Sequence, residues 1–146
     1  MADIIPFKGI LYNPDKVSGS DIMAPPYDIV TPEMKDALYR KSPCNIIRVD
    51  FGKDDDGDTE NENRYTRAAQ FLTDWLKDGI LTKETEPAFY SYEISYHING
   101  RQKKMRGFLG AVRIEELGKG KIHPHEMTYS KPKSDRLNIL RRLQAN

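Results

Sequence analysis

The sequence predicts an α+β protein: an antiparallel or mixed β-sheet with a central β-hairpin, packed against two or three helices. Three observations predict this class. Asn99-Gly100 separates two strand-like runs, which is the strongest short signal for a hairpin. Residues 60–77 carry apolar side chains at helical spacing. Segments of both kinds follow one another without a repeat or a linker, so we expect a single domain over residues 1–146.

The N-terminal residues are expected to form an edge strand and then a rigid corner. Residues 4–12 are largely apolar, but Pro6 cannot donate a ladder hydrogen bond, which favours a strand at the edge of a sheet. After a polar loop, Pro25-Pro26 fixes two φ angles and restricts the residue before it. The backbone of residues 24–28 should therefore be extended and stiff.

A helix and a second strand should follow this corner. Thr31 is a good N-cap, Pro32 suits the first helical position, and the helix should end near Arg40. Residues 45–51 are rich in β-branched side chains and predict a strand. The polar, acidic run that begins at Lys53 predicts a solvated loop.

The middle of the chain carries the two clearest patterns. The helix over residues 60–77 should stop at Gly79, and its apolar stripe is interpreted as core. The hairpin should join two strands within residues 89–114 through a type I′ turn. The stripe consists of Tyr65, Ala68, Ala69, Leu72, Trp75 and Leu76, and one face of the hairpin consists of Tyr90, Tyr92, Ile94, Tyr96 and Ile98.

The C-terminal part should form a turn, an extended segment and a last helix. Residues 115–120 predict the turn, and residues 121–125 predict the extended segment. Ser134 is the expected cap of a helix over residues 136–144, where apolar side chains recur at helical spacing.

Charge is distributed unevenly, although the net charge is only +1. Residues 1–100 carry 11 Lys and Arg against 18 Asp and Glu, a net charge of −7, whereas residues 101–146 carry 12 against 4, a net charge of +8. This asymmetry predicts an anionic partner for the C-terminal part. Glu126 and Asp135 inside the basic stretch argue against nucleic acid and favour a small phosphorylated ligand. The alternative is that the two halves neutralise each other across a shared surface.

Composition argues against a membrane protein and favours the cytoplasm. The apolar runs are only a few residues long, so none could cross a bilayer. The first residues lack the basic and apolar regions of a secretion signal. Cys44 is the one cysteine, which fits a reducing cytoplasm and a buried structural role for this residue.

Chemically reactive side chains concentrate in residues 122–136, directly before the last helix. His123 and His125 with Glu126 allow two interpretations: general acid–base catalysis, or a metal site of two histidines and one carboxylate. We favour acid–base catalysis, because three ligands so close in sequence rarely converge on one metal ion without a turn. Thr128 adds a hydroxyl group, although no nucleophile elbow accompanies it.

The same stretch has groups that bind phosphate. Lys131, Lys133 and Arg136 surround the expected helix start at Ser134, where free backbone N–H groups favour an anion. The sequence lacks the glycine-rich loop of a Walker-type site. The alternative is that Asp135 and Arg136 only pair with neighbours at the end of the helix.

Four motifs, in this order along the chain, resemble the family called domain of unknown function 1015. They are Ala24-Pro-Pro-Tyr-Asp, Glu86-Pro-Ala-Phe-Tyr, His125-Glu-x-Thr and Lys133-x-Asp-Arg. Family members are longer, so the resemblance implies that this chain is the N-terminal portion of a larger protein and that the missing C-terminal part is its partner. They carry an Asp-Gly-His-His-Arg motif that is absent here, and they are distantly similar to the ParB-like and free serine kinase group.

The resemblance implies part of a cytosolic enzyme that acts on a small phosphorylated metabolite, with phosphoserine-related phosphoryl transfer or hydrolysis in serine metabolism as the candidate reaction. The alternatives are a nucleotide or nucleic-acid binding module of ParB-like type and a non-catalytic assembly domain, with a homodimer as a candidate assembly. Magnesium, oriented by Asp28, is the candidate cofactor. The expected catalytic residues are His125, Glu126, Asp28 and Thr128, and the expected substrate-binding residues are Arg136, Lys133, Lys131, Asp135, Tyr27 and His123; Lys131 and His123 follow from local chemistry alone.

Overall fold

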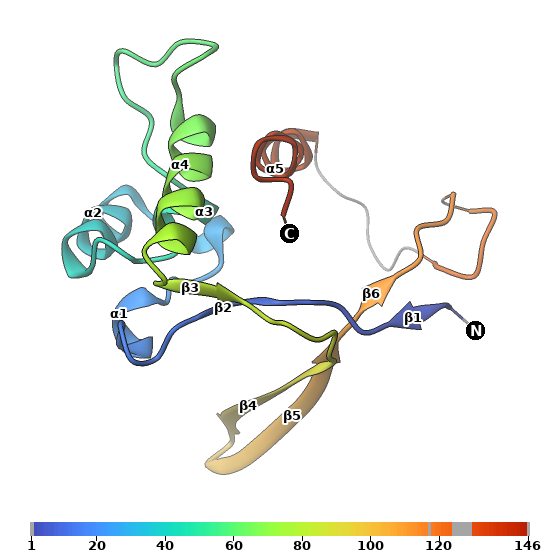
Figure 1. Cartoon of the computed structure of the whole chain (residues 1–146). Helices are drawn as coiled ribbons and strands as arrows, with labels where there is room; N and C mark the ends of the chain where they lie inside the picture. The colour runs from blue at the N-terminus through green and yellow to red at the C-terminus, as the bar shows by residue number, and fades with distance from the viewer. Residues whose placement is uncertain (1, 117, 124–129, 146) are drawn as a thin grey trace. The chain divides into compact units, whose positions relative to one another are not determined.

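The chain divides into two compact units (Figure 1). The computed structural model describes residues 2–116, 118–123 and 130–145, with only the backbone described for residues 130–132. We call residues 1–10 and 83–127 the sheet unit, and residues 11–82 and 128–146 the helical unit. The predicted α+β class is confirmed, whereas the prediction of a single domain stays a prediction.

The helical unit packs its helices around a small apolar core. Trp75 lies at its centre, with its ring 5.9 Å from that of Tyr12 and 5.8 Å from that of Phe71. Within the described residues, no helix is long and apolar enough to cross a membrane. The elements are α1 (Gly19–Ile22), the 3-10 turn η1 (Tyr27–Ile29), α2 (Pro32–Lys41), α3 (Ile47–Asp50), α4 (Arg64–Lys77) and α5 (Ser130–Leu143), together with β2 (Ile10–Tyr12), which pairs with β3 (Leu81–Lys83). The buried apolar residues are Ile22, Ile47, Val49, Ala68, Trp75 and Leu81.

Capping side chains decide where two of these helices begin. At the start of α2, Thr31 accepts a hydrogen bond from the backbone N–H of Met34 at 3.3 Å, as the sequence predicts. The α4 helix begins at Arg64, whereas the sequence predicted a start at residue 60. Asn63 is the cap, because its side chain accepts a hydrogen bond from the backbone N–H of Tyr65 at 3.0 Å. The residues before Asn63 bond to one another instead, and the backbone N–H of Thr59 donates to the carbonyl of Glu62 at 2.7 Å.

The strand predicted over residues 45–51 is wrong, because Ile47–Asp50 forms α3. Asn45 is fully buried, and its side-chain amide donates to the carbonyls of Asp21 at 2.7 Å and Met23 at 2.9 Å. Its Oδ1 accepts from the backbone N–H of Ile47 at 3.0 Å, which turns the chain into the helix. These tertiary hydrogen bonds outweigh the β propensity of the segment.

The sheet unit contains the predicted hairpin. Strand β4 (Tyr90–Ile98) pairs with β5 (Arg101–Leu109) in antiparallel register. Asn99 and Gly100 both adopt positive φ angles, of 50° and 72°, which a type I′ turn requires. A second antiparallel pair joins β1 (Ile4–Ile5) to β6 (Ala111–Val112).

The sheets are smaller than the sequence suggested. The described strands form three two-stranded sheets, and β4 and β5 pair only with each other among them, so a central position for the hairpin is not confirmed. The predicted edge strand over residues 4–12 is split into β1 and β2. Between them, the backbone N–H of Gly9 donates to the Tyr90 hydroxyl at 2.6 Å, so this N–H is not available for a hydrogen bond to a neighbouring strand.

Candidate functional site

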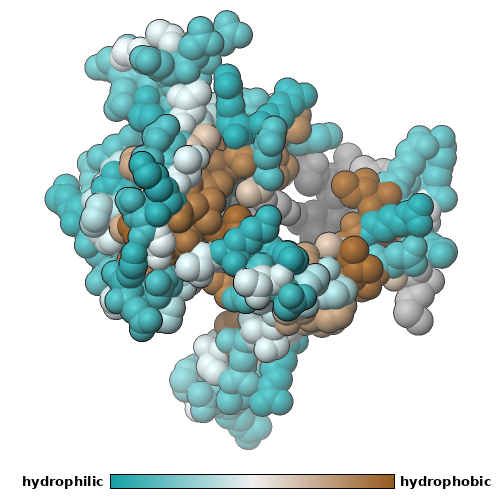
Figure 2. Space-filling model, in the orientation of Figure 1, coloured by the Kyte–Doolittle hydropathy of each residue, from teal (hydrophilic) through white to brown (hydrophobic). Residues whose placement is uncertain are grey.

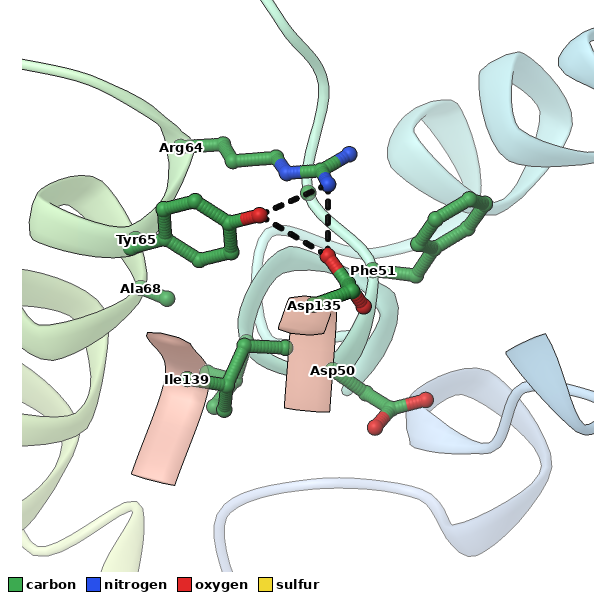
Figure 3. A pocket seen from close by; sticks show the side chains of 9 residues that line it. Asp50, Phe51, Arg64, Tyr65, Ala68, Asp135 and Ile139 are labelled. Atoms are coloured by element: carbon green, nitrogen blue, oxygen red, sulfur yellow. Dashed lines mark hydrogen bonds and ion pairs between the residues drawn. The ribbon is translucent and has the colours of Figure 1, made fainter. Parts of the chain in front are cut away.

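Asp135, one of the motif residues, lies at the centre of a polar cluster in the helical unit. Its Oδ1 accepts hydrogen bonds from Nη2 of Arg64 at 2.5 Å and from the hydroxyl of Tyr65 at 2.9 Å (Figure 3). Its Oδ2 accepts from Nη2 of Arg136 at 2.6 Å. The Asp135 side chain is only 13% exposed. Because Arg64 and Tyr65 open α4, this carboxylate ties α5 to the first turn of α4.

Arg136, the next residue of the motif, ties α5 to two further segments. Its Nη1 donates to Oδ1 of Asp50 at 2.6 Å, and its Nη2 donates to the backbone carbonyl of Asp50 at 2.7 Å. The guanidinium carbon lies 4.1 Å from the centre of the Tyr27 ring. A planar guanidinium suits both contacts, since it can bond in its plane while it stacks on an aromatic face. We call Asp135, Arg136 and their contacts with Asp50, Arg64, Tyr65 and Tyr27 the α5 anchor.

A second cation–aromatic layer lies beside the anchor. The Lys35 ammonium lies 3.6 Å from the centre of the Phe51 ring and donates to the carbonyl of Gly52 at 3.2 Å. The Phe51 ring in turn lies 6.1 Å from that of Tyr27. Arg64 also forms an ion pair with Asp54 at 3.2 Å. Three cations, Lys35, Arg64 and Arg136, are thus interleaved with three carboxylates, Asp50, Asp54 and Asp135.

The anchor is charged at neutral pH. Burial alone would raise the pKa of Asp135, but hydrogen bonds from Arg136 and Tyr65 and the charges of both arginines lower it below its ordinary value. Burial lowers the pKa of the Lys35 ammonium, and the nearby charge of Arg64 lowers it further. Opposite charges therefore favour the ionised form of the Asp135 carboxylate. The surroundings of Lys35 instead disfavour the charged form of its ammonium group.

The hollow beside Asp135 is a packing seam and not an open ligand cavity. It lies between α3, α4 and α5, and no part of it admits a water-sized sphere. Ala68 and Ile139 close it from the apolar side, and Asp135, Arg64 and Tyr65 meet at its polar side (Figure 3). The anchor therefore packs α5 against the unit, and ligand contacts must lie outside this seam.

The structure brings together three of the predicted site residues: Tyr27, Asp135 and Arg136. Asp28 follows Tyr27 in η1 and is exposed, and Lys133 is exposed on α5. His123 is an exposed residue of the sheet unit. Lys131 lies in the first turn of α5. The predicted His125, Glu126 and Thr128 lie outside the described residues.

The predicted helix start at Ser134 is wrong, because α5 begins at Ser130. Pro132 is compatible with the first turn of a helix, where its missing N–H is not needed. The backbone N–H groups of residues 134–136 therefore lie inside the helix, where they cannot form the predicted phosphate cradle. Asp135 and Arg136 do form ion pairs, as the alternative proposed, but with Arg64 and Asp50 on other segments as well as with each other at the start of the helix. A direct binding role for either residue stays a prediction.

Several residues of the cluster were not predicted from the sequence. Arg64 and Tyr65 were placed inside the helix predicted over residues 60–77, with Tyr65 on its core stripe, and Asp50 was placed in a strand. Asp135 contacts Arg64 across 71 positions, and Arg136 contacts Asp50 across 86. The only local signal is the strong Asn63 cap, which fixes the orientation of Arg64 and Tyr65 at the start of α4. Over the residues that the structure covers, no three His, Cys, Asp or Glu side chains gather where they could hold a metal ion.

Comparison with known proteins gives a family match that extends over nearly the whole chain. A family model described as "Protein of unknown function (DUF1015)" matches residues 4–146. The match confirms the resemblance drawn from the four motifs. No curated protein and no solved structure matches the chain.

Proposed function

This chain belongs to the family described as Protein of unknown function (DUF1015), and from that premise we propose that it is part of a cytosolic enzyme acting on a small phosphorylated metabolite. Phosphoserine-related phosphoryl transfer or hydrolysis, in serine metabolism, is the reaction we favour. The distant similarity that we expect between the family and the ParB-like and free serine kinase group, through a motif that this chain does not contain, is the reason for proposing a chemistry of phosphoryl groups.

The observation that carries this proposal is the position of the α5 start relative to the anchor. The anchor fixes α5 from Asp135 onward, and the first turn of this helix, from Ser130, contains Lys131 and Lys133. The first N–H groups of a 14-residue helix have no partner within the helix, and they carry a partial positive charge. With two lysines added, this turn is a better phosphate site than the one predicted at Ser134.

The remaining roles follow from the neighbouring motif residues. Asp28 directly follows Tyr27, whose ring stacks on Arg136, so a carboxylate lies next to a residue held by the anchor. We assign Asp28 the task of orienting a substrate hydroxyl or a magnesium ion. His125 and Glu126, shortly before the α5 start in the sequence, would transfer protons. Thr128 would supply a hydroxyl, and Tyr27 would contact the substrate from the helical unit.

Phosphate binding can be measured directly on this chain. Phosphoserine and inorganic phosphate are titrated into isotope-labelled protein while amide signals are followed by NMR. We expect the signals of the first turn of α5 to shift. Lys133→Gln should weaken binding about ten-fold, the effect of losing one charge-assisted hydrogen bond. Lys77→Gln is the matched control, because Lys77 is an exposed lysine in the last turn of α4. Absence of binding, or equal weakening in both variants, would contradict the proposal.

The link to serine is tested separately in the organism. Deletion of the gene should leave growth dependent on added serine, and a gene copy carrying Asp28→Asn should fail to restore it. Growth without serine after deletion would remove serine metabolism from the proposal but would leave phosphate binding to be judged by the titration.

A nucleotide-binding module of ParB-like type is the alternative that shares this chemistry. It would bind nucleotides or nucleic acid through the same lysines, and its affinity would fall steeply as salt is added. Phosphoserine binding without nucleotide binding at low salt would exclude it.

A further inference from the structure

The β4–β5 hairpin has one mainly apolar face, to which Lys103 and Arg101 add charges near the turn, and one charged face. Directly paired residues of an antiparallel ladder point to the same side, and Ile94 pairs with Met105. On the other side, Glu93 forms ion pairs with Lys104 at 2.7 Å and with Arg106 at 2.8 Å. The apolar face contains Tyr92, Ile94, Tyr96, Ile98, Met105 and Leu109, and each of these side chains is at least 40% exposed. A two-stranded ribbon of this kind is marginally stable unless more strands or a covering surface join it.

The two edges of the hairpin differ in charge. Strand β5 contains four Lys and Arg residues and no acid, whereas β4 contains one acid, Glu93, and no Lys or Arg. Like charges along an edge strand oppose pairing with another copy of that strand, so β5 is protected. The β4 edge is nine residues long, is exposed along residues 91–98 and has no such protection. In Figure 2 the side of the hairpin in view, at the bottom, is coloured mainly hydrophilic.

The sequence of β4 is suited to antiparallel pairing with itself. The near-palindrome Tyr90-Ser-Tyr-Glu-Ile-Ser-Tyr96 is centred on Glu93, where self-pairing would set two carboxylates opposite each other, so we place the axis one residue further on, at Ile94. If two copies pair about Ile94, then Ile94 lies opposite Ile94, Tyr92 lies opposite Tyr96, and Glu93 lies opposite Ser95. This register sets aromatic residues opposite one another, and such cross-strand pairs stabilise a sheet. It also avoids like charges opposite one another, which would destabilise the sheet.

We propose that β4 pairs with β4 of a second copy of this chain, antiparallel about a two-fold axis through Ile94. The product is a four-stranded sheet in the order β5, β4, β4, β5, with the basic β5 strands at its outer edges. A two-fold axis perpendicular to the sheet leaves both apolar faces on the same side, where they form one continuous tyrosine and isoleucine surface. The pairing is closed, because each β4 has only one free edge.

Disulfide cross-linking tests the register. In a Cys44→Ser background, Ile94→Cys should give a covalent dimer under mild oxidation, because residues opposite each other in an antiparallel pair have Cα atoms about 4.5–5.5 Å apart, within the range of a disulfide. Met105→Cys is the matched control: it is paired with Ile94 on the same face, with 47% exposure against 46%, but it lies on β5. Cross-linking that is absent at position 94, or equally strong at position 105, overturns the proposal.

Sedimentation tests the same edge without a new covalent bond. The unmodified chain should be a dimer, and Ile94→Lys should weaken the dimer at least about ten-fold, because two ammonium groups would face each other at the axis. Met105→Lys introduces the same charge on β5 and should leave the dimer in place. A monomeric chain at all concentrations overturns the proposal, and so do open polymers, because these would require β4 to pair with β5 of the next copy.

Discussion

The helical unit and the sheet unit use their side chains in opposite ways. In the helical unit, the charged motif residues Asp135 and Arg136 are turned inward, and every oxygen of the Asp135 carboxylate is occupied by a protein donor. In the sheet unit, apolar residues of the hairpin such as Ile94 and Tyr96 are left exposed. The difference teaches that a residue type alone does not tell whether its side chain is available at the surface. The helical unit adds a network of paired charges to its apolar core, whereas the sheet unit leaves apolar side chains exposed.

We expect the largest loss of stability from a substitution in the helical unit, at Asn45. Asn45→Ala should lower the free energy of unfolding by about 3 kcal/mol or more, because it leaves the carbonyls of Asp21 and Met23 and the N–H of Ile47 without partners. Denaturant unfolding followed by circular dichroism measures this. Asn61→Ala, in the exposed loop before α4, is the control and should have almost no effect.

The α5 anchor should give the next largest effect. Asp135→Asn keeps the shape of the side chain but removes the charge that faces Arg64 and Arg136, and we expect a loss of about 2–3 kcal/mol. A double-mutant cycle with Arg136→Ala should show that the two losses are not additive. Additive losses would mean that the two residues pack α5 independently, and the anchor would not act as one cluster.

The ionisation of Asp135 gives a dependence on pH. Because the folded-state pKa is lowered, its contribution is complete above the unfolded-state pKa of about 3.9 and is lost as the pH falls through the folded-state value. The difference in unfolding free energy between the wild-type chain and Asp135→Asn should therefore shrink between about pH 6 and about pH 3. Denaturant titrations at both pH values measure it. A difference that stays constant would show that the carboxylate charge is not what stabilises the anchor.

The hairpin should give the smallest effect. Gly100 has a φ of 72°, so Gly100→Ala should cost about 1 kcal/mol in the turn. This cost should appear as faster amide exchange in β4 and β5 and should leave the unfolding of the helical unit unchanged. Gly57→Ala is the control, because no atom lies within 4 Å of the position that its new Cβ would take. Loss of helical-unit stability in Gly100→Ala would show that the two units unfold together.

Elements with short-range causes were predictable from the sequence. Thr31 caps α2 through a residue three positions away, and Asn99-Gly100 makes a turn that its own φ preferences favour. The stripe of α4 that includes Ala68 and Trp75 also lies in the core, as its spacing indicates. Each of these predictions needs only information that lies within a few residues.

The candidate site was predictable only in part. The motifs singled out Tyr27, Asp135 and Arg136, and the structure brings these three together. The motifs did not show that the groups bonded to them are Asp50, Arg64 and Tyr65, and the predicted role of Asp135 and Arg136 in binding phosphate stays a prediction. The predicted cap at Ser134 also moved to an earlier helix start, which shifts the proposed phosphate site to the first turn of α5.

By itself, the sequence determined the α+β class, the hairpin, the cap of α2 and the family, because backbone preferences, side-chain periodicity and motif order are local properties of a chain. Only the tertiary structure decided that residues 47–50 are helical and that Asp135 and Arg136 dock α5. The physical reason is that a buried amide or carboxylate must find donors and acceptors wherever the fold provides them. For Asn45, Asp135 and Arg136 those partners come from segments that no local pattern connects.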